Sequence, residues 1–103
     1  MARFTVRVEL HSASYSDYET LHNAMERRGF SRRITSGDGK VYHLPTAEYD
    51  RGGLLTSQEV LDAAKAAAVE TGKNYAVLVT GAVSRSWVGL GEVVPKPQFA
   101  HFR

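Results

Sequence analysis

Residues 56–80, TSQEVLDAAKAAAVETGKNYAVLVT, decide the fold because they place one helix and one apolar strand in a single stretch. The first four residues match a capping box, in which Thr56 caps the helix and Glu59 bonds back to it. An alanine-rich run follows as far as Gly72, and it predicts a helix that packs closely on a sheet. Tyr75 to Thr80 is apolar at odd and even positions alike, which predicts an interior strand or one covered on both faces.

A strand and a helix also form the start of the chain. Residues 3–11 alternate between polar and apolar side chains, which predicts a strand with one face in the core and the other in water. Ser16 followed by Glu19 matches another capping box, so a helix is expected to begin there. Gly29 is placed to end this helix, because glycine readily adopts the left-handed conformation found after helix ends.

Two short strands are expected between the helices, and two turns compete for the hairpin that joins them. The first turn is Ser36-Gly37-Asp38-Gly39, which separates the alternating residues 30–35 from a strand at 40–44. The second turn is Pro45-Thr46, with residues 47–51 as the return strand. Both placements stay open, and both give two adjacent antiparallel strands.

The order of these elements predicts an α+β fold. Strand, helix, strand, strand, helix, strand is the βαββαβ order of the ferredoxin-like sandwich, with two helices on one face of a four-stranded antiparallel sheet. At 103 residues the chain is expected to form a single domain over residues 1–94. Residues 83–90, which include Trp87, are a candidate for a short extra strand, and residues 95–103 are expected to form a C-terminal tail.

The composition narrows the class of protein. Hydrophobic residues make up 43% of the chain and charged residues 23%, as is typical of a globular protein in water. The N-terminal residues lack the apolar segment of a signal peptide and no apolar run is long enough for a membrane span, so a cytoplasmic protein without membrane contact is expected. The chain has no cysteine, which excludes thiol catalysis and cysteine-bound zinc.

The segment Arg27-Arg28-Gly29-Phe30-Ser31-Arg32-Arg33 gathers arginines at the boundary between a predicted helix and a predicted strand. A guanidinium group presents a planar set of donors that matches phosphate oxygens in pairs. The net charge of the chain is only +2, so attraction to nucleic acid has to come from such a local cluster. Arg27, Arg28, Arg32 and Arg33 are therefore predicted to bind RNA.

Two histidines are candidates for acid–base chemistry on RNA. Cleavage next to a 2′-hydroxyl needs one group that accepts its proton and another that protonates the leaving oxygen. If the turn at 37–39 forms the hairpin, His11 and His43 are expected on neighbouring strands. The alternative is that both are ordinary surface residues. His22 shares a helical stripe with Met25 and is expected at the edge of the core instead.

Neither a metal site nor a cofactor is expected. Metal-dependent cleavage needs carboxylates that converge on one point. The acidic candidates are scattered over predicted strand, helix and turn positions without the spacing of metal ligands: Glu9, Asp17, Asp38 and Asp50. Asp38 lies between two glycines, as is typical of a residue that forms a turn.

The run from Phe4 to about Asp62 resembles the GhoS-like family, small antitoxins of type V toxin–antitoxin systems. The matching features are the first strand, the helix entry at Ser14-Tyr15-Ser16, the helix exit at Gly29-Phe30-Ser31 and the second helix start at Thr56-Ser57. The resemblance implies a ferredoxin-like fold and endoribonuclease activity on the toxin's messenger RNA. The family is also similar in fold to the Cas2 nucleases, which hold a metal ion with an aspartate near the end of the first strand. Leu10 stands at that place here, which argues against metal-assisted cleavage.

Two functions fit these observations. The first is a small, dimeric RNA-binding protein that acts as an antitoxin-type endoribonuclease on messenger RNA, as the resemblance implies. The second is a non-catalytic protein-interaction module, either an antitoxin or a host or phage inhibitor, that docks on a partner protein through the sheet face or the Trp87 region. Binding of RNA by the arginine cluster would distinguish the first function from the second.

Overall fold

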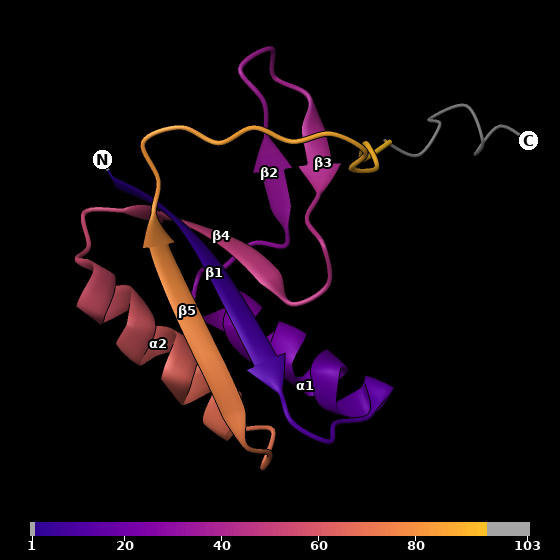
Figure 1. The fold of residues 1–103 in the computed structure, drawn as a ribbon, viewed down its shortest axis with the longest axis vertical. Helices are drawn as coiled ribbons and strands as arrows, with labels where there is room; N and C mark the ends of the chain where they lie inside the picture. The colour runs from indigo at the N-terminus through magenta and orange to yellow at the C-terminus, as the bar shows by residue number, and fades with distance from the viewer. Residues whose placement is uncertain (1, 95–103) are drawn as a thin grey trace, which may run out of the picture.

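The strands of the chain form two antiparallel sheets in the computed structural model, which describes residues 2–94 (Figure 1). In chain order the elements are β1 (Ala2–Leu10), α1 (Tyr15–Arg27), β2 (Arg33–Thr35), β3 (Val41–His43), β4 (Glu48–Gly53), α2 (Ser57–Val69) and β5 (Tyr75–Gly81). The larger sheet has the strand order β4-β1-β5, and β2 and β3 form a two-stranded hairpin. The tail predicted at residues 95–103 lies outside the described residues.

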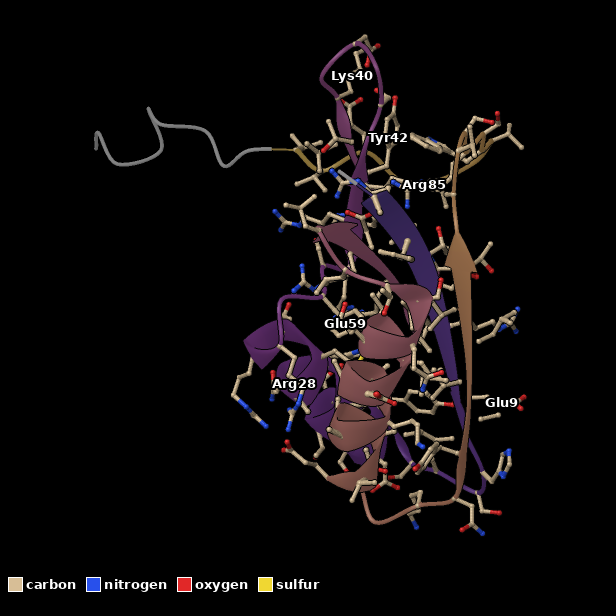
Figure 2. All side chains as sticks on the ribbon, turned by 90° about the vertical axis from the view of Figure 1, so that its left-hand side faces the viewer. Glu9, Arg28, Lys40, Tyr42, Glu59 and Arg85 are labelled. Carbon is tan, nitrogen blue, oxygen red and sulfur yellow. The ribbon has the colours of Figure 1, made fainter. Side chains whose placement is uncertain are left out.

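Both helices lie on the same side of the three-stranded sheet, as predicted, and within residues 2–94 no helix covers the other side, which we call the open face (Figure 2). Strand β1 lies in the middle of the sheet, where Val6 is paired with Tyr49 of β4 and Val79 of β5. The buried side chains of β1 are Phe4, Val6, Val8 and Leu10. The alternation along residues 3–11 therefore predicted the core face of this strand correctly.

Helix α2 packs against the sheet through its alanines. Its fully buried residues are Val60, Ala64, Ala67 and Ala68, and the helix contacts β1, β5 and α1. Methyl side chains allow close approach of helix and sheet while they still remove apolar area from water. Neither helix of the described chain is long and apolar enough to cross a membrane.

The predicted four-stranded sheet is not found among residues 2–94, because the chain before β2 touches the larger sheet at one bridge. Ser31 and Asp50 exchange two backbone hydrogen bonds, of 2.8 and 2.7 Å, and β2 then separates from β4. The other edge of the hairpin is covered by the segment after β5, where the His43 N–H donates to the Gly91 carbonyl at 2.9 Å. Strand β3 is thus paired on both edges without joining the larger sheet. The arrangement is α+β and is compatible with a ferredoxin-like topology.

Both candidate turns reverse the chain. The turn at residues 36–40 joins β2 to β3, and it is closed by the Ser36 N–H, which donates to the Lys40 carbonyl at 2.8 Å. The turn at Pro45 leads into β4 and is closed by the Glu48 N–H, which donates to the Pro45 carbonyl at 3.1 Å. The first turn therefore carries the hairpin, while the second delivers the strand that pairs with β1.

The segment after β5 runs across the hairpin without forming the predicted extra strand. Residues 83–90 contain no strand. Further along, Glu92 forms a single antiparallel bridge with Tyr42. This pairing is too short to define a strand, although two backbone hydrogen bonds hold the segment on β3: the His43 N–H donates to the Gly91 carbonyl at 2.9 Å, and the Val93 N–H donates to the Val41 carbonyl at 2.8 Å.

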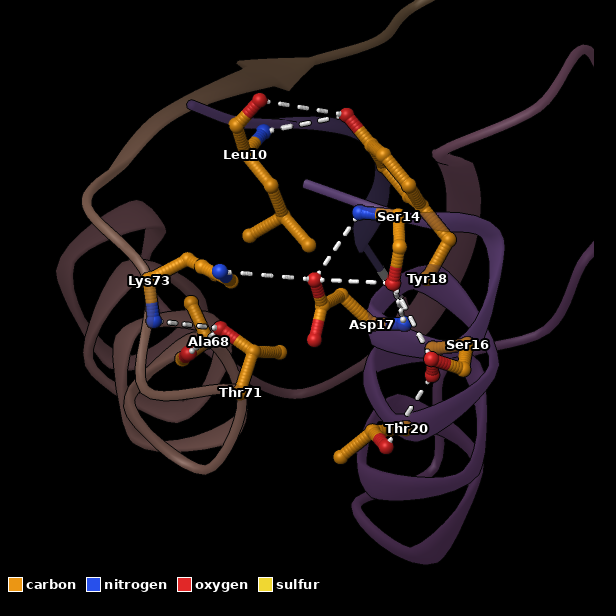
Figure 3. Close-up of polar contacts among 9 residues, drawn as sticks. All are labelled: Leu10, Ser14, Ser16, Asp17, Tyr18, Thr20, Ala68, Thr71 and Lys73. Carbon is orange, nitrogen blue, oxygen red and sulfur yellow. Dashed lines mark hydrogen bonds and ion pairs between the residues drawn. The ribbon is translucent and has the colours of Figure 1, made fainter. Parts of the chain in front are cut away.

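A capping box begins each helix, but in α1 it lies two residues earlier than predicted (Figure 3). Helix α2 begins after Thr56, as the sequence indicates. In α1 the Ser14 hydroxyl accepts the Asp17 N–H at 3.3 Å, and the Asp17 carboxylate accepts the Ser14 N–H at 2.8 Å. Ser14 and Ser16 each precede an acidic residue by three positions, so the two compete for the cap. The ammonium of Lys73 lies 3.7 Å from the Asp17 carboxylate and supports the earlier start.

Strand β5 differs from its prediction. It is an outer strand of the three-stranded sheet and is covered on one face only. Tyr75, Val77 and Val79 pack against the core, whereas Leu78 is 64% exposed on the open face. The prediction was wrong because β5 has apolar side chains on both faces although only one face is buried. The periodicity of apolar residues is the same in such a strand as in one that is buried on both faces.

His22 lies at the edge of the core, as its helical stripe predicts. The residue is 5% exposed, and its Nδ1 atom is 2.7 Å from the hydroxyl oxygen of Tyr49 on β4. Burial lowers the pKa of His22, and the positive charge of Arg32 lowers it further. Burial also raises the pKa of Tyr49. The hydrogen-bonded pair is therefore neutral in the folded protein at neutral pH.

We expect the free energy of unfolding to decrease as the pH falls below about 6.5, the pKa of an unperturbed histidine. The unfolded chain takes up a proton on His22 there, while the folded chain resists it, so acid favours the unfolded state. Melting temperatures at about pH 7.5 and about pH 5.5 check this. The His22→Gln variant keeps a hydrogen-bonding side chain and should lose less stability in acid than the wild type. Equal losses in the two proteins would contradict this role of His22.

Candidate functional site

The predicted arginine cluster is divided where α1 ends. Gly29 has a φ of 86° and follows the C-cap residue Arg28, so it is the left-handed glycine predicted after the helix end. Arg27 and Arg28 both form ion pairs with the carboxylate of Glu70, which follows α2, and the Arg28 pair measures 2.8 Å. Hydrogen bonds from Arg27 and Arg28 lower the pKa of Glu70. These two arginines connect the C-terminal ends of the helices and thus have a structural role of their own.

Arg32 and Arg33 lie around a pocket of about 310 Å³ that is also lined by His43 and Glu26. Arg33 and His43 stand directly opposite each other on β2 and β3, so their side chains leave the same face of the hairpin. The Leu44 N–H donates to the Arg32 carbonyl at 2.9 Å and holds the two walls together. The pocket, called the Arg33–His43 pocket below, thus combines two predicted RNA-binding residues with one predicted catalytic residue.

His11 is not part of this pocket. It follows the last residue of β1, and its Nε2 atom lies 3.6 Å from a carboxylate oxygen of Glu9. Figure 2 shows the hairpin residue Tyr42 near one end of the molecule and Glu9 well away from it, beside the half nearer the other end. The turn at residues 36–40 forms as expected, but within the described chain β1 pairs with β4 and β5 and not with β3. The structure therefore does not bring His11 and His43 together.

The acidic residues considered as metal ligands have other partners. Asp17 caps α1, and Asp38 accepts the Lys40 N–H inside the hairpin turn at 3.1 Å. Asp50 lies between Arg3 and Arg85, with nitrogen–oxygen distances of 3.0 and 2.9 Å. Across residues 2–94, no three histidine, aspartate or glutamate side chains form a group that could hold a metal ion.

A larger hollow, of about 550 Å³, lies on the side of the hairpin near the open sheet face. Arg3, Arg85, Tyr42 and Trp87 are among its lining residues, and we call it the Trp87 pocket. Sequence reasoning did not find it, because its walls come from the start of β1, the hairpin and the segment after β5. The one available signal was Trp87 itself, the single tryptophan of the chain.

Comparison with known proteins supplies the family. No curated protein matches the chain closely enough to count as a relative. A family model described as endoribonuclease GhoS matches residues 1–81, which include both helices, the larger sheet and the Arg33–His43 pocket. The resemblance seen in the first helix entry and exit thus extends over most of the chain. The chain belongs to the GhoS endoribonuclease family.

Proposed function

We propose that this chain is an antitoxin-type endoribonuclease that binds messenger RNA and cuts it at the Arg33–His43 pocket. One observation carries the proposal beyond the family match: Arg33 and His43, from adjacent strands, line the same pocket together with Arg32. The pocket thus combines groups that can bind a phosphate with an imidazole that can serve as the base, and the acid that cleavage also requires can be a solvent water.

The arginines would hold the phosphate that is to be cut. Arg33 is exposed and Arg32 half-buried, so both guanidinium groups can reach RNA at the surface. Arg32 and Arg33 carry two positive charges, and Glu26, which also lines the pocket, carries one negative charge. The net charge of +1 matches the single negative charge of one phosphodiester. Arg27 and Arg28 would extend this surface along the RNA, with a smaller share of the binding energy because both already contact Glu70.

His43 would act as the base. Its imidazole accepts the proton of the ribose 2′-hydroxyl, and the 2′-oxygen then forms a bond to phosphorus while the bond from phosphorus to the 5′-oxygen breaks. The products are a 2′,3′-cyclic phosphate and a 5′-hydroxyl, whose proton comes from solvent water because the pocket is open to it. Arg33 donates to the non-bridging oxygens, where negative charge increases in the transition state.

Replacing Arg32 and Arg33 by alanine should weaken binding of single-stranded RNA about tenfold or more at physiological salt, because two phosphate contacts are lost. The slope of log affinity against log salt should fall by about 0.7 for each lost contact. Fluorescence anisotropy with labelled RNA at several salt concentrations measures both quantities. Lys65→Ala with Arg7→Ala is the matched control, since it removes the same charge from two exposed positions that line neither pocket.

The alternative, a protein-interaction module, predicts another result. A wild-type protein that does not bind RNA at any salt concentration would contradict the proposed function. Recovery of a stoichiometric protein partner that resists ribonuclease treatment would then support docking through the open sheet face, where Leu78 is exposed.

A further inference from the structure

The Trp87 pocket has an aromatic wall that is held in place from one side. The rings of Tyr42 and Trp87 meet edge to face, with centroids 5.6 Å apart and planes inclined by 65°. Tyr42 comes from β3 and Trp87 from the segment after β5, so the contact fixes the segment on the hairpin. This geometry is the favourable one for an aromatic pair, because the positive edge of one ring meets the negative face of the other.

Trp87 lines two neighbouring hollows of the surface. It lines the Trp87 pocket and also a smaller hollow of about 300 Å³, in which Ile34 and Leu90 take part. Its indole is therefore accessible from more than one side, although the residue is only partly exposed. An indole that is held by one aromatic neighbour and borders two hollows is a platform on which a flat ring can stack.

The floor of the Trp87 pocket carries a fixed positive charge. Arg85 donates through Nη1 to the Asp50 carboxylate at 2.9 Å and to the Thr5 hydroxyl at 3.2 Å. Arg3 donates through Nη1 to the other carboxylate oxygen at 3.0 Å. Two guanidinium groups thus share one carboxylate, which leaves one net positive charge. In these contacts, which are those found within residues 2–94, Arg3 and Arg85 each donate through Nη1. The Nη2 atom of each guanidinium group can therefore bind an anion.

We propose that the Trp87 pocket is a nucleotide subsite for single-stranded RNA, in which a base stacks on Trp87 and its phosphate binds Arg85 and Arg3. This inference rests on the proposed function. The volume of about 550 Å³ lies within the range of pockets that take small molecules of nucleotide size. Duplex RNA does not fit this role, because its bases are already stacked and paired.

The two sites lie on one hairpin. Tyr42 and His43 are consecutive residues of β3, and consecutive side chains of a strand point to opposite faces. An RNA strand bound at His43 therefore passes around the hairpin before a later nucleotide of the same strand reaches Tyr42 and Trp87. Residues 82–87 follow the part of the chain that the family model matches, which ends at Gly81. The subsite would thus add affinity for single-stranded RNA in this particular chain, while its stacking and phosphate contacts tolerate any base.

Trp87 is the only tryptophan, so its fluorescence reports directly on the subsite. The experiment titrates the full-length protein with a short single-stranded RNA and follows both indole emission and the anisotropy of a labelled copy of the RNA. We expect quenching of the indole on binding. Trp87→Leu should weaken single-stranded RNA binding about 5- to 100-fold, the effect of losing one stacked base, and Trp87→Phe should restore most of it. A duplex of the same sequence should bind the wild type and Trp87→Leu equally.

The outcomes separate this inference from the proposed function. RNA binding that depends on Arg32 and Arg33 but leaves the Trp87 emission unchanged overturns the subsite and leaves the proposed function standing. Equal affinity of wild type and Trp87→Leu for single-stranded RNA overturns it too. If the wild type does not bind RNA, both proposals fall. Because the emission is measured in the wild type, this test does not depend on correct folding of any variant.

Discussion

The His43→Gln variant should cut RNA about 10²- to 10⁴-fold more slowly than the wild type, which is the usual effect of removing a general base. Glutamine has a similar size and can donate and accept hydrogen bonds, but it cannot accept a proton at neutral pH. Arg32 and Arg33 stay in place, so RNA affinity should hardly change. The measurement is the single-turnover rate of cleavage of a labelled RNA with protein in excess, beside the anisotropy titration.

His11→Gln is the matched control. It makes the same substitution at the end of β1, away from the Arg33–His43 pocket, and should leave the cleavage rate unaltered. A His43→Gln variant that cuts as fast as the wild type would contradict the assignment of the base. A loss of rate in His11→Gln alone would move the reaction to the end of β1 near Glu9.

The Leu21→Ala variant should lose about 2–5 kcal/mol of unfolding free energy, because it removes buried apolar atoms and leaves a cavity in the core. Leu21 is fully buried on α1, in the core formed with the sheet and α2. For a domain of this size the melting temperature should fall by about 4–8 °C for each kcal/mol lost. Urea denaturation followed by circular dichroism measures the change.

Asn23→Ala provides the comparison, since Asn23 is exposed on the same helix and its loss should alter stability by no more than about 0.5 kcal/mol. A loss of less than about 1 kcal/mol in Leu21→Ala would contradict the close packing of α1 on the sheet.

The sequence predicted those parts of the fold that nearby residues determine. The alternation along β1, the capping box at Thr56 and the left-handed Gly29 all depend on residues within a few positions. The separation of β2 from β4 could not be predicted from residues within a few positions. It is visible only in long-range contacts, namely the isolated bridge between Ser31 and Asp50 and the hydrogen bond between His43 and Gly91.

In the candidate site, too, the sequence predicted what nearby residues determine and missed what distant residues determine. The arginine cluster was visible in the sequence, but Arg27 bonds to Glu70, which is 43 positions away, and no local pattern predicts this partner. Arg33 and His43 meet because the hairpin turn at residues 36–40 forms, and this turn was one of two alternatives. His11 could not be excluded from the site before the pairing of β1 was known.

The single bridge between Ser31 and Asp50 has a consequence for how this chain can evolve. The helices and the larger sheet contain nearly all of the buried core, while most residues that line the two pockets come from the hairpin and the segment after β5. Substitutions that alter the pockets therefore disturb few core contacts. Selection for a new target RNA can act on one part of the molecule while the other keeps it folded, so a mutation that changes recognition need not be rescued by a second, stabilising one.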